Sequence, residues 1–494
     1  MGDFILPLLK KGDYVNGSFV NPEVTNGYIN AANPGDRDDV IGRFPFSFVN
    51  AKKAIAYAKE AQRPWQNKPI SERIEHVRDF RGQLERRQKI IIATLTREIG
   101  IPVWEARQEV VETMHQIDAL INAAPIRFAT QQTPNGSSEI QHLPIGVLAL
   151  ITPLHLPFQS SAFFSVAALL SGNTIIHNPS KYAPGIGQAV AELWDRCRLP
   201  RGVYNMVQGP GSAFGQRLIS NNQVDGAIFA GSHKVAKDIR QNTDIPPEFP
   251  LIMFMGGKSS AIVLDDADLD TAARSILSGA FRATGQRPSA IARVFVSAKN
   301  SAALTDKLAK AANQISIGYG LEQGIYMGPL ASEQIRKRYH RFGRALLSYN
   351  HDIILETKNI DYERRGFYVR PAIYRINWTN GAPILDEEPA GPILLIYEVQ
   401  SIQEAVDLHN RCSFRRMTAI FTSPERIDID EIVGQLQTGA IFINQTPHES
   451  HLPVSAMGRA SNGNITGVGL LDLLSRRRAI FRPRHTLNTE NNTP

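Results

Sequence analysis

The chain has 494 residues, of which 43% are hydrophobic and 20% charged, with a formal net charge of +7. This globular composition excludes a disordered chain, a coiled coil and a collagen-like repeat, and the two cysteines exclude a disulfide-stapled scaffold or a thiolate-rich metal site. With no apolar run near the roughly 18 residues of a membrane-spanning helix and no signal-peptide pattern, we expect a soluble cytoplasmic protein.

The first part of the chain has the pattern of amphipathic helices. Apolar residues recur at three- and four-residue spacing over residues 49–61 and 70–124, which predicts helices packed on one side. Pro64, Pro69 and Pro102 are expected to divide this region. Residues 131–142 are polar and rich in turn formers, which indicates a hairpin tip or a linker.

From residue 144 onward, short strands alternate with helices. We expect strands at 147–151, 174–177, 204–207 and 225–230, with helices at 158–170 and 186–196 between them. The strand pattern resumes at 261–264, 292–297, 393–399, 418–422 and 440–444. Such alternation predicts parallel sheets covered on both faces, and the length fits two α/β domains in series.

A glycine-rich turn follows the strand expected at 204–207. Gly209, Gly211 and Gly215 precede or open a helix, where glycines let the backbone approach a pyrophosphate and the helix N-terminus offers free N–H groups. The spacing differs from G-x-G-x-x-G, so a plain tight turn is an equally good interpretation.

Nine short motifs occur in an order that resembles the aldehyde dehydrogenase superfamily, from about residue 15 to residue 480. They begin at Pro144, Gly172, Pro179, Pro200, Gly231, Gly256, Asp266, Gly285 and Glu388. Residues 97–106 are most similar to the N-succinylglutamate 5-semialdehyde dehydrogenases of arginine catabolism.

This resemblance implies two Rossmann-type α/β domains and a small β oligomerisation arm. The cofactor-binding-type domain would comprise residues 1–128 and 145–250, and the catalytic-type domain residues 251–465. The arm would comprise residues 129–144 together with a C-terminal segment at 466–490. A family member of this type would assemble as a homodimer or as a dimer of dimers.

The resemblance also implies a reaction, and the sequence departs from the family at the residues that carry it. The family uses a cysteine nucleophile, a glutamate base and an asparagine that holds the oxyanion. Those positions hold Pro288, Phe254 and His155. Proline has neither a thiol nor the backbone N–H that would serve the oxyanion, so we expect a degenerate site with no intact catalytic residue.

The cofactor positions are altered as well. The family's ribose-binding lysine and glutamate are Asn178 and Lys181 here, whereas Ser232 and Glu388 match the family. We therefore expect NAD or NADP to bind weakly or not at all, with NADP losing less because Lys181 suits a phosphate.

These departures favour a pseudoenzyme that binds a metabolite, a nucleotide or a protein partner. One alternative is an active NAD(P)-dependent N-succinylglutamate semialdehyde dehydrogenase, and another is a hydrolase that uses Ser289 and His155. His448 and His451 could hold a metal, although a polar loop is the favoured interpretation. The late basic residues, including Arg476, suit a solvated edge better than nucleic acid, for which the sequence has no motif.

Overall fold

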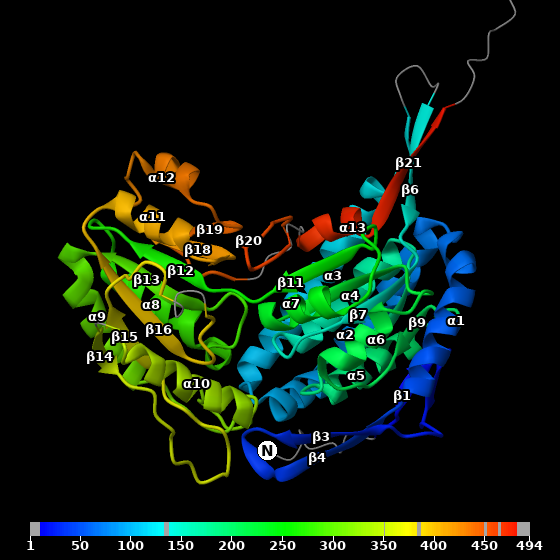
Figure 1. Cartoon of the computed structure of the whole chain (residues 1–494), viewed down its shortest axis with the longest axis horizontal. Helices are drawn as coiled ribbons and strands as arrows, with labels where there is room; N and C mark the ends of the chain where they lie inside the picture. Colours follow the sequence, from blue (N-terminus) through cyan, green and yellow to red (C-terminus); the bar gives the residue numbers. More distant parts are fainter. Residues whose placement is uncertain are drawn as a thin grey trace, which may run out of the picture.

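Two seven-stranded sheets organise the chain (Figure 1). The computed structural model describes residues 10–132, 138–349, 351–382, 387–448, 452–462 and 466–481. Within these ranges no helix is long and apolar enough to cross a membrane. The expectation of an α/β protein with two large sheet-based parts and a small arm is confirmed.

The first sheet has the strand order β11-β10-β7-β8-β9-β1-β2. Its five parallel strands are β7 (Val147–Ile151), β8 (Thr174–Asn178), β9 (Tyr204–Met206), β10 (Gly226–Gly231) and β11 (Leu251–Met255). The strands β1 (Asp13–Val15) and β2 (Ser18–Val20) extend it in antiparallel fashion. The strand β11 begins at Leu251 and pairs with β10, so the first sheet extends beyond residue 250, where the cofactor-binding-type domain was expected to end. The domain limits stay a prediction.

Helices cover both faces of the first sheet. One face packs on α2 (Ile70–Ile99), α3 (Val103–Arg127), α4 (Pro157–Leu170) and α5 (Pro184–Asp195), and the other on α1 (Phe48–Gln66), α6 (Gly211–Ile219) and α7 (His233–Asn242). Successive side chains along a strand point to opposite faces of the sheet, so each strand packs against both sets of helices. In β11, for example, Ile252 and Phe254 face the first set of helices, whereas Met253 and Met255 face the second.

The second sheet has the order β14-β15-β16-β13-β12-β18-β19. Its strands are β12 (Ser259–Val263), β13 (Ile291–Ser297), β14 (His351–Leu355), β15 (Ala372–Ile376), β16 (Ile393–Val399), β18 (Met417–Phe421) and β19 (Ala440–Ile443). One face packs on α8 (Leu269–Phe281) and α9 (Ala298–Asn313), and the other on α10 (Glu333–Leu346), α11 (Ile402–Arg411) and α12 (Ile429–Gln435).

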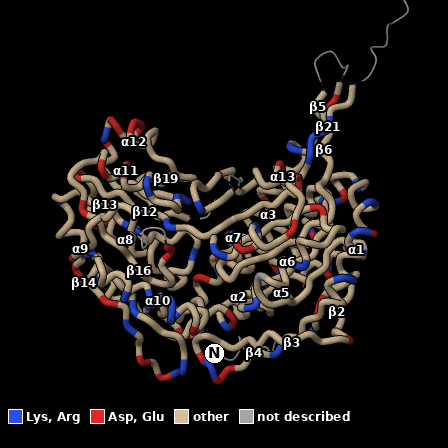
Figure 2. Tube along the Cα trace, viewed as in Figure 1, with Lys and Arg blue, Asp and Glu red and all other residues tan. Residues whose placement is uncertain are grey.

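A three-stranded sheet forms the arm, which projects from the body in Figure 1. In it β6 (Ser138–Pro144) pairs with β5 (Gln131–Gln132) and with β21 (Ser475–Phe481). Segments more than 300 residues apart thus pair, as expected from the resemblance. Figure 2 shows basic residues beside β6 and β21, and Arg476, Arg477 and Arg478 are exposed there. Arg482, Arg484 and His485 lie outside the described residues.

An N-terminal hairpin, which the sequence analysis did not predict, reaches the second half of the chain. It is formed by β3 (Gly27–Asn33) and β4 (Asp36–Phe46). The Arg37 backbone N–H donates to the Arg365 carbonyl at 2.9 Å, and the Tyr368 hydroxyl donates to the Gly35 carbonyl at 2.8 Å. These contacts join the N-terminal hairpin to the segment that precedes β15.

The predicted helix break at Pro64 is wrong. The residue lies inside α1, close to its C-terminal end at Gln66. The next residue, Trp65, is buried and donates its indole N–H to the Leu169 carbonyl at 3.2 Å. Tertiary packing therefore carries α1 past the proline, whereas Pro69 and Pro102 do mark the starts of α2 and α3.

Candidate functional site

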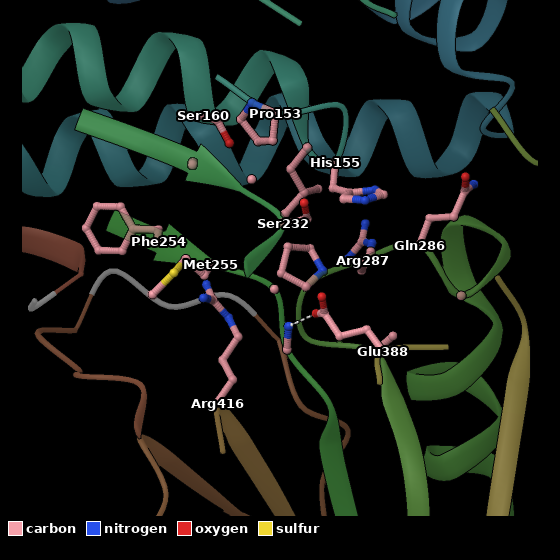
Figure 3. Close-up of a pocket in the computed structure, with 18 of the residues that line it drawn as sticks. Pro153, His155, Ser160, Ser232, Phe254, Met255, Gln286, Arg287, Glu388 and Arg416 are labelled. Atoms are coloured by element: carbon pink, nitrogen blue, oxygen red, sulfur yellow. Dashed lines mark hydrogen bonds between the residues drawn. The ribbon is translucent and has the colours of Figure 1, made fainter. Parts of the chain in front are cut away.

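A cavity of about 200 Å³ lies between the two sheet-based parts of the chain (Figure 3). Its wall is formed by the ends of β7, β10 and β11, by the first half of α4, and by the segments around residues 286–292 and 388–391. Parallel strands commonly present ligand-binding residues at such carboxyl ends. All three positions expected at the centre of the family's reaction, Pro288, Phe254 and His155, line this cavity.

The loop before Pro288 is held in a strained shape. The 3-10 turn η2 (Arg282–Gly285) contains Ala283 at φ 47° and Thr284 at φ 56°, where side chains cost roughly 1–2 kcal/mol per residue. The Ala283 N–H donates to a Glu105 carboxylate oxygen at 2.8 Å. The Thr284 hydroxyl donates to the Gly328 carbonyl at 2.9 Å. The surroundings therefore hold the loop in place although it ends in a residue without a nucleophile.

Phe254 closes one side of the cavity with an aromatic wall. It is the fourth residue of β11, and its ring stacks on Phe164 of α4 with centroids 5.3 Å apart and planes 9° apart. Phe163 lines the same cavity. A phenylalanine cannot accept a proton from water, so this wall offers packing rather than general-base chemistry.

His155 lies between β7 and α4 and faces the cavity (Figure 3). Burial, together with the smaller effect of the nearby Arg338, lowers the pKa of its imidazole to about 4. The ring is therefore neutral at pH 7. Ser289 is buried at 3% exposure, and among the described wall residues its neighbours Pro288 and Ala290 occur but Ser289 does not. The structure therefore does not place Ser289 beside His155 on this wall, as the serine–histidine alternative would require.

Glu388 folds against the glycine pair that follows β11. One carboxylate oxygen accepts the Gly257 N–H at 2.5 Å, as Figure 3 shows. A Cβ on Gly256 would lie 1.7 Å from the same oxygen, so a larger residue there would displace the Glu388 carboxylate. Burial raises the pKa of Glu388, which the Gly257 hydrogen bond and Lys258 oppose.

Arginines dominate the charged part of the wall. Among the described wall residues, Arg287, Arg338 and Arg416 are cationic and Glu388 is the anionic one. The Arg287 Nε lies 3.0 Å from a Glu105 carboxylate oxygen. The arginine is 8% exposed, yet its Nη2 atom has no hydrogen-bond partner. No sequence pattern points to Arg287, because a buried donor without a partner is visible only in the folded structure.

The positions expected to hold a cofactor ribose are occupied differently. Asn178, the last residue of β8, donates from its side-chain amide to the Val207 carbonyl at 3.0 Å and to the Gly209 carbonyl at 3.3 Å. Lys181 is exposed, with its ammonium 5.0 Å from the centroid of the Tyr182 ring. Asn178 therefore caps neighbouring strand ends instead of pointing donors outward.

The glycine-rich turn has packing reasons for two of its three glycines. A Cβ on Gly209 would lie 2.2 Å from the Phe214 ring, and one on Gly215 would lie 2.7 Å from Ile151. Gly211 adopts φ +64° with open space around it. Ser232 begins α7, and its hydroxyl accepts the Val235 N–H at 3.4 Å. The free N–H groups of α7 are thus partly used within the chain.

The candidate metal ligands His448 and His451 follow β19 in the chain. Residues 449–451, including His451, lie outside the described residues. His448 is exposed, and its Nδ1 lies 3.2 Å from the Thr446 carbonyl. The part of the chain that the structure describes contains no group of three or more histidine, cysteine, aspartate or glutamate side chains that could hold a metal.

Comparison with protein families matches residues 20–477 to the aldehyde dehydrogenase family. The chain is 31% identical over 420 residues to an N-succinylglutamate 5-semialdehyde dehydrogenase of Escherichia coli, covering 84% of each chain. It is 29% identical over 445 residues to an alpha-ketoglutaric semialdehyde dehydrogenase of Bacillus subtilis, covering 87% of this chain and 89% of the relative.

Solved structures give the same result for the fold. Lactaldehyde dehydrogenase from Escherichia coli superposes with a TM-score of 0.88 at 26% identity, covering 95% of this chain and 98% of that one. Betaine aldehyde dehydrogenase from Staphylococcus aureus, solved in complex with NAD+, superposes with a TM-score of 0.90 at 22% identity, covering 98% and 97%.

The paired sheets and the β arm define an α/β protein of the dehydrogenase type, with a cavity between the sheets. The chain belongs to the aldehyde dehydrogenase family. Its curated relatives at about 30% identity include the N-succinylglutamate 5-semialdehyde dehydrogenases that the sequence motifs resemble.

Proposed function

We propose that this family member does not catalyse aldehyde oxidation and instead binds a small metabolite in its central cavity. The observation that carries the proposal is the joint presence of Pro288, Phe254 and His155 on the wall of one cavity. These residues occupy the positions that would supply the nucleophile, the base and the oxyanion donor in the family.

The expected rate losses decide between an impaired enzyme and a binding protein. A missing oxyanion donor costs about a hundred- to a thousand-fold in rate, and a missing general base about a hundred- to ten-thousand-fold. Without a nucleophile no covalent intermediate forms. A neutral imidazole at position 155 can still donate one hydrogen bond, but it replaces neither the nucleophile nor the general base.

The same proposal includes weak cofactor binding. NAD(P) is the family's cofactor, and the residues at its ribose site fit it poorly. Both protons of the Asn178 amide are directed to backbone carbonyls, and Lys181 carries a positive charge where the family has a carboxylate. Losing one charge-assisted hydrogen bond costs about 1.5–3 kcal/mol. We therefore derive no step through NAD(P) in this chain.

The test is a comparison between the native chain and the triple variant P288C/F254E/H155N. The native chain should show no NAD- or NADP-linked oxidation of succinylglutamate semialdehyde or of simple aldehydes. The triple variant restores the family's three side chains and should gain measurable oxidation at high cofactor concentration. Turnover by the native chain near one per second, the low end of ordinary enzymes, would establish the active dehydrogenase instead.

A further inference from the structure

The cavity combines a buried cation with an aromatic wall, and this combination restricts what it can bind. The Nη2 of Arg287 is buried without a hydrogen-bond partner, in a side chain that lines the cavity and is 8% exposed. An unsatisfied buried donor is costly, and more so when it is charged. A ligand that supplies an anionic oxygen to this atom removes that cost.

The protein groups near Arg287 leave its outer donor available. Glu105 lies 3.0 Å from the Nε and is shared with Arg282, whose Nε lies 3.6 Å from the same carboxylate oxygen. Glu105 is not among the described residues of the cavity wall. Glu109, another nearby carboxylate, accepts the backbone N–H groups of Phe158 and Gln159 at 3.0 and 3.1 Å. Neither carboxylate forms a hydrogen bond with the Nη2 atom.

The other part of the wall is apolar and aromatic. Phe254 and Phe164 stack face to face, and Phe163 and Met255 line the cavity beside them. Figure 3 shows Phe254 and Met255 on one side of the cavity, with Arg287 and His155 toward the other. An elongated ligand would therefore meet the aromatic wall at one end and the guanidinium at the other.

We infer that the cavity takes a small carboxylate with an apolar or aromatic tail, its carboxylate at Arg287 and its tail on the aromatic wall. This inference rests on the proposed binding function and names the class of ligand. Such an acid is already at the oxidation level of a dehydrogenase product, so binding it requires no hydride transfer. The cavity volume of about 200 Å³ is below the roughly 300–1,000 Å³ of typical ligand pockets, which restricts the cavity to a small acid.

Calorimetry with a matched pair of probes tests the inference. We expect 3-phenylpropanoate to bind at least tenfold more tightly than 3-phenylpropanamide, which has the same shape and no charge. Acetate, which lacks the tail, should bind at least tenfold more weakly than 3-phenylpropanoate. R287Q should abolish the preference for the acid, whereas R344Q on the exposed side of α10 should leave it unchanged.

R287Q loses a buried ion pair, so its folding can also suffer. Substitutions of Phe254 therefore provide a second test that keeps this ion pair. F254E places a carboxylate on the aromatic wall and should weaken 3-phenylpropanoate at least tenfold, while F254L keeps binding within a few-fold. Equal affinity for acid and amide, or no binding of either probe, would overturn the ligand class. Neither result touches the proposal of catalytic inactivity, which only turnover of an aldehyde overturns.

Discussion

Individual residues decide the chemistry of this chain. Pro288 follows a loop whose left-handed residues and buried hydrogen bonds hold it at the cavity wall. Phe254 takes its place on that wall because the alternation along β11 directs it to the face of α4. The scaffold thus presents positions 288, 254 and 155 to one cavity whatever side chains they carry, which makes each position open to direct substitution.

The first prediction concerns the nucleophile position. The double variant P288C/H155N gains a thiol, a backbone N–H and an amide donor. An activated ester such as p-nitrophenyl acetate should therefore acylate the new cysteine. We expect a burst of about one p-nitrophenolate per active site, measured by stopped-flow absorbance. The single variant H155N, without the thiol, should show no burst, and a burst of equal size there would contradict this role of position 288.

The second prediction concerns the ribose site. In N178K/K181E the charges at these two positions match the family's pattern, so NAD should bind at least tenfold more tightly than it does to the native chain. Titration calorimetry measures both affinities. Micromolar NAD binding by the native chain, tighter than its binding of NADP, would show that Asn178 and Lys181 do not weaken the site.

At the scale of elements, buried glutamates hold helix starts against the sheet. Glu98 accepts the Gly185 and Ile186 N–H groups of α5 at 2.7 and 2.9 Å, and Glu109 does the same for α4. An anionic or polar acceptor satisfies the first N–H groups of a helix, which have no partner within it. Long-range capping of this kind joins α2 to α5, and α3 to α4, whose first half lines the cavity.

The third prediction follows from the pKa of Glu98, which burial raises to about 8 from 4.5. A raised carboxylate pKa means that the folded state holds the proton more tightly than the unfolded state does. The stability that this difference contributes is complete below pH 4.5 and is lost as pH rises through about 8. At pH 5 the native chain should exceed E98Q in free energy of unfolding. That advantage should shrink by about 2–4 kcal/mol by pH 8.5.

Urea unfolding across this pH range measures the effect. The exposed Glu85, also on α2, supplies the control. E85Q keeps Glu98 in place and should therefore lose stability over this pH range as the native chain does. A constant difference between the native chain and E98Q would mean that Glu98 does not titrate in this window.

The fourth prediction uses the strained turn η2. Ala283 is left-handed at φ 47°, so A283G removes a steric cost that offsets the flexibility glycine adds to the unfolded chain. We expect the free energy of unfolding to change by less than about 0.5 kcal/mol, whereas A273G inside α8 should cost about 1 kcal/mol or more. Equal losses in both variants would show that the turn is not strained.

Most helices and strands of the body could be predicted from periodicity, because burial on one face imposes a regular spacing of apolar residues. The predicted break at Pro64 was wrong because the packing of Trp65 against α4 outweighs the local preference of proline for ending a helix. The hairpin β3–β4 escaped prediction because it is fixed by distant contacts such as that between Gly35 and Tyr368. Motif order indicated positions 288, 254 and 155, but no sequence pattern revealed the orphaned donor of Arg287.

At the scale of the whole molecule, β21 lies at the edge of the arm's three-stranded sheet among the described residues. The strand β21 pairs with β6 over seven residues, and its Phe481 is 81% exposed. Exposed strand edges with apolar ends tend to be covered by partners. We propose a homodimer or a dimer of dimers, which depends on backbone pairing and shape rather than on any catalytic group.

The fifth prediction tests this assembly. Light scattering at micromolar concentration should give at least twice the 54.7 kDa of one chain. Truncation after residue 474 removes β21 and should lower the oligomeric state, provided that circular dichroism shows an intact fold. A clean monomer mass for the native chain would refute the role of the arm.

The central claim is that the native cavity binds without oxidising, and a single-turnover experiment tests it most directly. Protein in excess over succinylglutamate semialdehyde is mixed with saturating NAD or NADP, and reduced cofactor is followed by absorbance. In a single turnover, reduced cofactor is detected before any product is released. A slow release step therefore cannot hide hydride transfer. We predict no reduced cofactor above the uncatalysed background over an hour. Formation of one equivalent within seconds would contradict the account.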